Sequence, residues 1–129
     1  MRRLLTNTCH HSRVAGRRYN HDLTQKISLN AYHEASDNKL EELSEWLEAK
    51  LETRYDRGAD VSLSNGVLTV VVDNQNTYVI NKQTPNRQIW LSSPLSGPKR
   101  FDLVDGRWVD RADRMELNDL LCQELSQLI

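Results

Sequence analysis

The chain contains 129 residues, of which 38% are hydrophobic and 27% are charged, a composition typical of a single folded domain. It has only five glycines and three prolines, which excludes fibrous and low-complexity classes. No apolar run approaches the ~18 residues that a membrane-spanning helix needs, so we expect no membrane partner.

Charge is distributed unevenly along a chain whose total is nearly neutral. Of 17 basic and 18 acidic residues, five arginines and no acidic residue lie within residues 1–21. Residues 22–129 therefore have 12 basic and 18 acidic residues, a net charge of −6. Because such a body repels nucleic acid and attracts cations or basic proteins, we expect no nucleic-acid partner.

The first 21 residues are rich in arginine, serine, threonine and histidine. This acid-free composition is typical of a mitochondrial transit peptide, and the alternative is a disordered basic tail. We therefore expect a transit peptide over residues 1–21 and one folded domain over residues 22–129.

Two segments have the periodicity of amphipathic helices. Leucines at spacings of three and four predict a helix from Ala31 to about Tyr55, with Asn30 as its N-cap. A second leucine stripe predicts a closing helix over about residues 115–129.

Short apolar segments between these helices predict strands joined by tight turns, and Asn65-Gly66 and Asp105-Gly106 are typical hairpin turns. Short connections favour antiparallel pairing. The fold class is therefore α+β, a two-layer α/β sandwich with both helices packed on one face of a five- to six-stranded, mainly antiparallel sheet. The predicted strands are 61–63, 67–72, 77–80, 88–91, 100–104 and 107–109.

One face of the first predicted helix has a row of carboxylates. Their spacing places them within an arc of about 80°, and Asp56 and Asp60 continue the row towards the first strand. Exposed carboxylates suit Fe²⁺, Fe³⁺, Mn²⁺, Ca²⁺ or Mg²⁺, but side chains on successive turns cannot enclose an ion, so binding should be weak. The alternatives are a solvated outer face and a docking face for basic proteins. The row consists of Glu34, Asp37, Glu41, Glu45, Glu48 and Glu52.

Ordinary enzyme sites are excluded by the residues available. No histidine follows His33, so a Ser-His-Asp, Cys-His or HExxH arrangement is not expected. The sequence also contains no glycine-rich phosphate-binding motif. We predict no catalytic residues of the hydrolase or transferase type.

A tryptophan in the fourth predicted strand is a candidate for protein recognition. Ile89 and Leu91 alternate with Trp90, so an inward apolar pair leaves the indole on the opposite face. An exposed tryptophan among amide and hydroxyl groups is typical of an interaction hot spot. The alternative is an indole covered by the adjoining loop.

The run TYVINKQTPNRQIWLSSPLSGPKRFDL, residues 77–103, closely resembles the signature of the frataxin family. The acidic helix and the tryptophan-bearing last hairpin are also similar, so the resemblance covers about residues 29–129. It implies a protein of the mitochondrial matrix that promotes iron–sulfur cluster assembly. Such a protein binds Fe²⁺ or Fe³⁺ weakly and docks on the complex of cysteine desulfurase and scaffold protein. A ferroxidase or an iron-storage protein is the alternative.

The resemblance also implies which positions bind metal and partner. The resemblance implies, in addition, a monomer that iron can assemble into oligomers. The implied metal ligands are Glu34, Asp37, Glu41, Glu45, Asp56 and Asp60, together with His33. The implied partner-binding residues are Asn81, Lys82, Gln83, Asn86, Gln88, Trp90 and Arg100.

Overall fold

The structure is a computed structural model that describes residues 27–129. The predicted transit peptide, residues 1–21, lies outside the described residues. From residue 27 onward, a long helix is followed by six strands and a shorter closing helix. Among these residues, neither helix is long and apolar enough to cross a membrane.

The six strands form one antiparallel sheet in which each strand pairs with the next along the chain. Asn65-Gly66 and Asp105-Gly106 form the predicted hairpin turns, and all four residues have the positive φ that a two-residue turn of this kind requires. The strands are β1 (Asp60–Ser64), β2 (Val67–Asp73), β3 (Asn76–Gln83), β4 (Gln88–Ser93), β5 (Gly97–Val104) and β6 (Arg107–Asp110).

Helix α1 (Leu29–Lys50) begins earlier and ends earlier than the sequence predicts. Its N-cap is Ser28, whose Oγ accepts a hydrogen bond from the Ala31 backbone N–H at 3.1 Å, so the prediction of Asn30 is wrong. After Lys50 come Leu51, the C-cap of α1 and the last leucine of the stripe, and then the 3₁₀ helix η1 (Glu52–Arg57), which contains no leucine.

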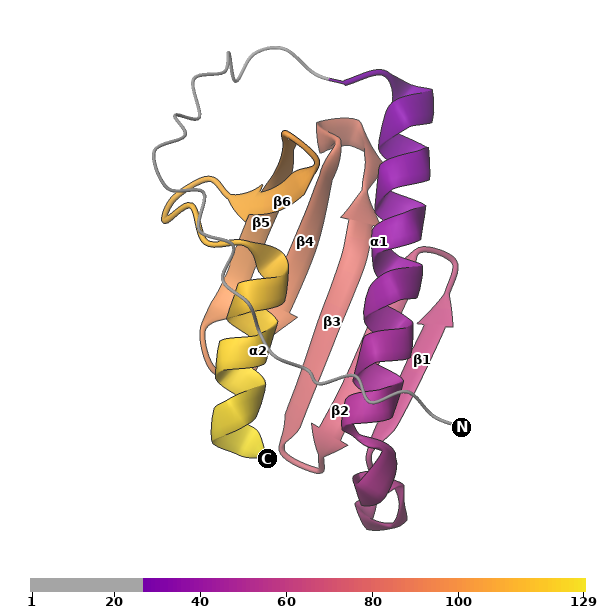
Figure 1. Ribbon diagram of the computed structural model, residues 1–129, viewed down its shortest axis with the longest axis vertical. Coiled ribbons are helices and arrows are strands. Elements are labelled where there is room, and N and C mark those ends of the chain that lie inside the picture. The colour runs from indigo at the N-terminus through magenta and orange to yellow at the C-terminus, as the bar shows by residue number, and fades with distance from the viewer. Residues whose placement is uncertain (1–26) are drawn as a thin grey trace.

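Helix α1 and helix α2 (Leu117–Leu128) both lie on the same face of the sheet (Figure 1). This arrangement confirms the predicted two-layer sandwich. Neither helix covers the opposite face, which we call the outer sheet face (Figure 1). The outer sheet face is therefore the surface that the two helices leave for other contacts.

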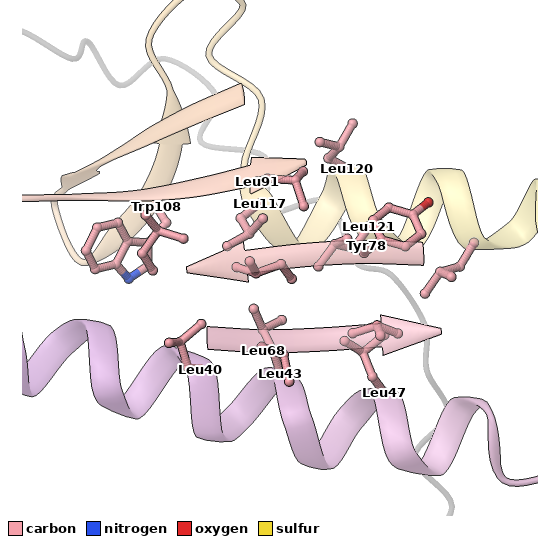
Figure 2. Close-up of a cluster of buried hydrophobic side chains, with 14 of the residues drawn as sticks. Leu40, Leu43, Leu47, Leu68, Tyr78, Leu91, Trp108, Leu117, Leu120 and Leu121 are labelled. Atoms are coloured by element: carbon pink, nitrogen blue, oxygen red, sulfur yellow. The ribbon is translucent and has the colours of Figure 1, made fainter. Parts of the chain in front are cut away.

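The core fills the space between the two layers. Leu40, Leu43 and Leu47 of α1 point towards the sheet, where they meet Leu68 of β2, as Figure 2 shows. Trp108 of β6 is 2% exposed and belongs to the same cluster. Because large apolar side chains from both helices are buried on this face, hydrophobic burial fixes which face of the sheet stays outside.

A buried carboxylate in α2 is a feature that the sequence did not reveal. Glu124 is 5% exposed, and its Oε1 accepts hydrogen bonds from the Tyr78 hydroxyl at 2.9 Å and the Ser93 hydroxyl at 2.5 Å. These bonds join α2 to β3 and β4. Burial and the contact with Glu124 raise the pKa of Tyr78 far above its ordinary value.

Candidate metal ridge and docking surface

The predicted carboxylates of α1 lie along the solvent side of the helix. Glu34, Asp37, Glu41 and Glu45 are all exposed, and we call these four residues the acidic ridge. An α-helix rises about 1.5 Å per residue, so Glu34 and Glu45 are about 16 Å apart along the axis. The ridge is therefore an extended acidic strip, as the spacing predicts.

The other two carboxylates among the implied metal ligands lie beyond the helix. Asp56 is in η1 and Asp60 begins β1, and both are exposed. Within residues 27–129, no group of three or more histidine, cysteine or acidic side chains converges tightly enough to hold a metal ion. The carboxylates suit hard cations in their chemistry, but they offer single or paired ligands, which favours weak binding at several places.

His33 lies at the N-terminal end of the ridge and contacts a lysine from the sheet. Lys82 Nζ is 2.8 Å from His33 Nδ1 and 2.8 Å from Asp37 Oδ1. Lys82 is one of the implied partner-binding residues, but its side chain lies on the helix side of β3. Strand alternation explains this difference, because Asn81 and Gln83 on either side point to the outer sheet face.

The remaining predicted partner-binding residues of the strands share the outer sheet face. The register pairs Asn81 of β3 with Trp90 of β4, and Trp90 in turn with Arg100 of β5. Two residues further along β3, Gln83 pairs with Gln88 of β4. Antiparallel pairing therefore brings residues that are up to 19 positions apart in the sequence into two adjacent rows across three strands.

Trp90 is only partly exposed, and its neighbours hold its indole in a defined position. Its indole is half-buried, and Nε1 donates a hydrogen bond to Oε1 of Gln88 at 2.9 Å. The guanidinium carbon of Arg100 lies 4.9 Å from the ring centre, a cation–π arrangement. Gln88 itself is only 7% exposed, so it supports the surface more than it forms it.

Two further residues complete this network, and neither is among the residues predicted from the sequence. Gln88 Nε2 donates to Asp102 Oδ1 at 2.9 Å, and Arg111 Nε donates to the other carboxylate oxygen of Asp102 at 3.1 Å. The strand register could have identified Asp102, which is paired with Gln88. Arg111 follows β6 in a turn, where no periodicity signals its position. A hollow of about 450 Å³ lies beside this network, lined by Gln88, Pro98, Lys99, Arg100, Asp110, Arg111 and Ala112.

Asn86 lies at the end of the short 3₁₀ helix η2 (Thr84–Asn86), which connects β3 to β4. It is exposed. The next residue, Arg87, has a φ of 55° and donates from Nη1 to the Thr84 carbonyl at 3.0 Å. This contact closes the turn that leads from Asn86 into β4.

A buried tyrosine connects the layer of the acidic ridge with the strand that contains Trp90. The Tyr32 hydroxyl of α1 donates to the Gln88 carbonyl at 2.8 Å, and Tyr32 is fully buried. Its ring is 6.3 Å from the Trp108 ring in an edge-on arrangement. Burial raises the pKa of Tyr32, so the hydroxyl remains a hydrogen-bond donor at neutral pH.

These features define a small α/β-sandwich protein with an acidic surface on its helical layer and a polar, tryptophan-bearing surface on its sheet. The family model described as a frataxin-like domain matches residues 25–129. The mitochondrial frataxin homologue of Saccharomyces cerevisiae is 48% identical over 103 residues, and mitochondrial frataxin of Dictyostelium discoideum is 50% identical over 108 residues. The chain belongs to the frataxin family.

The matched regions span 80% and 81% of this chain but only 59% and 56% of those two relatives. A crystal structure of trimeric yeast frataxin complexed with ferrous iron matches with a TM-score of 0.67 and 47% identity, and covers 74% of this chain and 85% of the yeast chain. This likeness confirms the fold. The relatives are named as mitochondrial proteins, and this chain is likewise mitochondrial.

Proposed function

We propose that this chain promotes iron–sulfur cluster assembly in the mitochondrial matrix by docking on the complex of cysteine desulfurase and scaffold protein. The observation that supports this most is the hydrogen-bonded position of Trp90 on a sheet face that neither helix covers. Residues 1–21 would direct the precursor to the organelle, and residues 22–129 would do the docking.

The chemistry of the outer sheet face favours a protein partner. Tryptophan and arginine are enriched among residues that dominate binding energy, and Trp90 and Arg100 lie next to each other here. Gln88 and Asp102 already restrain their neighbours through hydrogen bonds. A surface ordered before binding loses less side-chain entropy when the partner arrives, which strengthens association.

The acidic ridge supports weak iron binding as the second part of the proposal. Carboxylate oxygens are ligands for Fe²⁺ and Fe³⁺, and the yeast relative was crystallised with ferrous iron. In this proposal iron is cargo or signal rather than a resident cofactor, because paired ridge carboxylates release a metal easily. We expect a monomer when iron is absent and oligomers when iron is added.

A ferroxidase or iron store would use the same ridge differently. Carboxylates favour Fe³⁺ over Fe²⁺ and so promote oxidation by O₂, but buried di-iron enzymes enclose their metals with ligands from several helices. Counting the Fe²⁺ ions consumed per chain separates the two functions. Uptake that stops at a fixed stoichiometry supports the proposal, whereas continuous turnover with O₂ supports the ferroxidase.

Docking itself is tested by isothermal titration of the chain into the cognate desulfurase–scaffold complex. We expect saturable binding to the complex that persists when iron is chelated, since the outer sheet face contains no predicted metal ligand. The separate desulfurase and scaffold serve as controls that locate the contact. Absence of binding to the complex, with and without Fe²⁺, would contradict the docking function.

A further inference from the structure

A lysine ammonium already lies at one end of the acidic ridge. Lys82 Nζ is 2.8 Å from both His33 Nδ1 and Asp37 Oδ1, although the three residues come from β3 and α1. The Lys82 side chain is only 14% exposed, whereas the Asp37 side chain is 58% exposed. The cation therefore approaches the ridge from the protein side, and the carboxylate remains open to solvent.

Three contacts position the backbone, the stem and the ammonium group of Lys82. The Lys82 backbone N–H donates to the Gly66 carbonyl at 3.0 Å. Gly66 has a φ of 77°, and a Cβ atom at that position would lie 3.2 Å from Lys82 Cδ, so the stem of the lysine packs directly over the glycine. The ammonium group also lies 5.8 Å from the centre of the Tyr32 ring. The backbone and stem of the lysine are thus held in the sheet, and displacement of its ammonium group moves only the end of the side chain.

The ammonium group lies 2.8 Å from an imidazole nitrogen and 2.8 Å from a carboxylate oxygen. Ammonium has only hydrogen-bond donors, so His33 Nδ1 must present its lone pair to Lys82. Imidazole nitrogen and carboxylate oxygen are also ligands for divalent transition metals. A metal ion bound to the same two atoms would lie within a few ångströms of the ammonium charge, where like charges repel strongly.

We infer that Lys82 is a built-in competing cation, and that a divalent metal binds between His33 and Asp37 only by displacing its ammonium group. The inference rests on the proposed iron binding of the ridge and refines where it occurs. Metal then binds first near Glu41 and Glu45, away from the lysine. The β3 segment that contains Lys82 also contains Asn81 and Gln83 of the outer sheet face, so displacement would be felt at the edge of the docking surface.

The test is a site-resolved NMR titration of the full chain with Zn²⁺ alone, which is diamagnetic and accepts both imidazole and carboxylate ligands. The His33 ring signals are followed individually, because three other histidines precede it in the sequence. In Lys82→Gln we expect the affinity at His33 to rise about two- to fivefold, the range expected for a partly exposed ion pair. In the unsubstituted chain, the Lys82 Cε signal should shift at the same Zn²⁺ concentration as the His33 signals.

Lys50→Gln is the matched control because it makes the same change in net charge. It lies about 25 Å from His33 along α1, well beyond the screening length of about 8 Å at physiological salt, so the affinity at His33 should not change. An unchanged or weaker affinity at His33 in Lys82→Gln overturns the inference. A Lys82 Cε signal that stays constant in the unsubstituted chain while His33 binds Zn²⁺ overturns it too, whether or not the variant folds.

The proposed function has a separate readout in the same samples. Fe²⁺, added without oxygen, should broaden the signals of Glu41 and Glu45 in the unsubstituted chain because it is paramagnetic. If those signals do not change, the proposed iron binding by the ridge fails, while the comparison with Zn²⁺ still decides the role of Lys82. If they broaden and Lys82→Gln has no effect on His33, only the inference fails.

Discussion

The guanidinium carbon of Arg100 lies 4.9 Å from the centre of the Trp90 ring, on the face of the sheet that neither helix covers. The register makes this contact possible, because Trp90 of β4 and Arg100 of β5 are directly paired. The indole Nε1 donates a hydrogen bond to Oε1 of Gln88. The tryptophan is thus ordered before any partner binds, and this relationship is the basis of the docking proposal.

Trp90→Ala should weaken binding to the desulfurase–scaffold complex by about 2 kcal/mol or more, as tryptophan hot spots do. The fold should change little, because the indole is only half-buried, and we expect the free energy of unfolding to fall by no more than about 1 kcal/mol. Isothermal titration measures the first effect, and urea denaturation measures the second.

Two other tryptophans provide controls for this variant. Trp46→Ala removes a half-buried indole from α1 and should leave docking intact. Trp108→Ala empties a core position and should cost about 3–5 kcal/mol of stability. A Trp90→Ala protein that is as unstable as Trp108→Ala would show that Trp90 is a core residue and would refute its role in docking.

Neutralising one ridge carboxylate should weaken iron binding without harming the fold. In Glu41→Gln the repulsion between Glu41 and its neighbours four residues away in both directions, Asp37 and Glu45, is relieved. Stability should therefore stay the same or rise by about 0.2–0.5 kcal/mol for each such pair. Fe²⁺ titration under anaerobic conditions measures the affinity, and thermal denaturation measures the stability.

The adjacent Glu42 offers a control of equal charge. Glu42 forms an ion pair with Lys39 at 3.2 Å on the flank of the helix, away from the ridge. Glu42→Gln should leave the Fe²⁺ affinity unchanged. Equal losses of affinity in the two variants would mean that iron responds to total charge and that the ridge is not a site.

Stability should decline at alkaline pH, in part because of Tyr78. Its pKa is raised above the ordinary value of 10.0 by burial first and then by the hydrogen bond with Glu124. Below about pH 10 both folded and unfolded chains keep the proton, so the stabilising contribution is fully present. Above that pH the unfolded chain releases the proton while the folded chain retains it, and stability is lost progressively as pH rises.

Tyr78→Phe tests this linkage. At neutral pH the variant should lose about 1–3 kcal/mol, because the buried Glu124 carboxylate loses a hydrogen-bond donor. Between about pH 9 and about pH 11 its stability should fall less steeply than that of the unsubstituted chain. Tyr32, whose pKa is also raised by burial, should preserve part of the slope. Identical slopes in the two proteins would disprove the contribution of Tyr78.

Much of the fold follows from local patterns in the sequence. The leucine spacing predicts α1 because burial against a sheet requires one apolar stripe, and the Asn-Gly and Asp-Gly pairs predict hairpins because they tolerate positive φ. The exact ends of α1 do not follow from periodicity. Ser28 and Asn30 are both good capping residues, and only the backbone geometry selects Ser28.

The candidate site could be predicted only where side-chain alternation along a strand, or the pairing register between strands, places its residues. Alternation in β3 places Lys82 on the other face of the sheet from Asn81 and Gln83. The face on which Lys82 lies is therefore predictable from the strand pattern. Its contact with His33 depends on how α1 crosses the sheet, which no local pattern encodes. The hydrogen bond from Arg111 to Asp102 depends on the conformation of the turn after β6, which no local pattern predicts either.

The central claim is that the chain activates cluster assembly by docking through its outer sheet face. The most direct test measures the rate of sulfide production by the cognate desulfurase–scaffold complex with stoichiometric amounts of this chain, of Trp90→Ala and of Glu41→Gln. We expect the unsubstituted chain and Glu41→Gln to stimulate the rate, and Trp90→Ala to lose most of the stimulation. A rate that the unsubstituted chain does not change, even with Fe²⁺ present, would contradict the account.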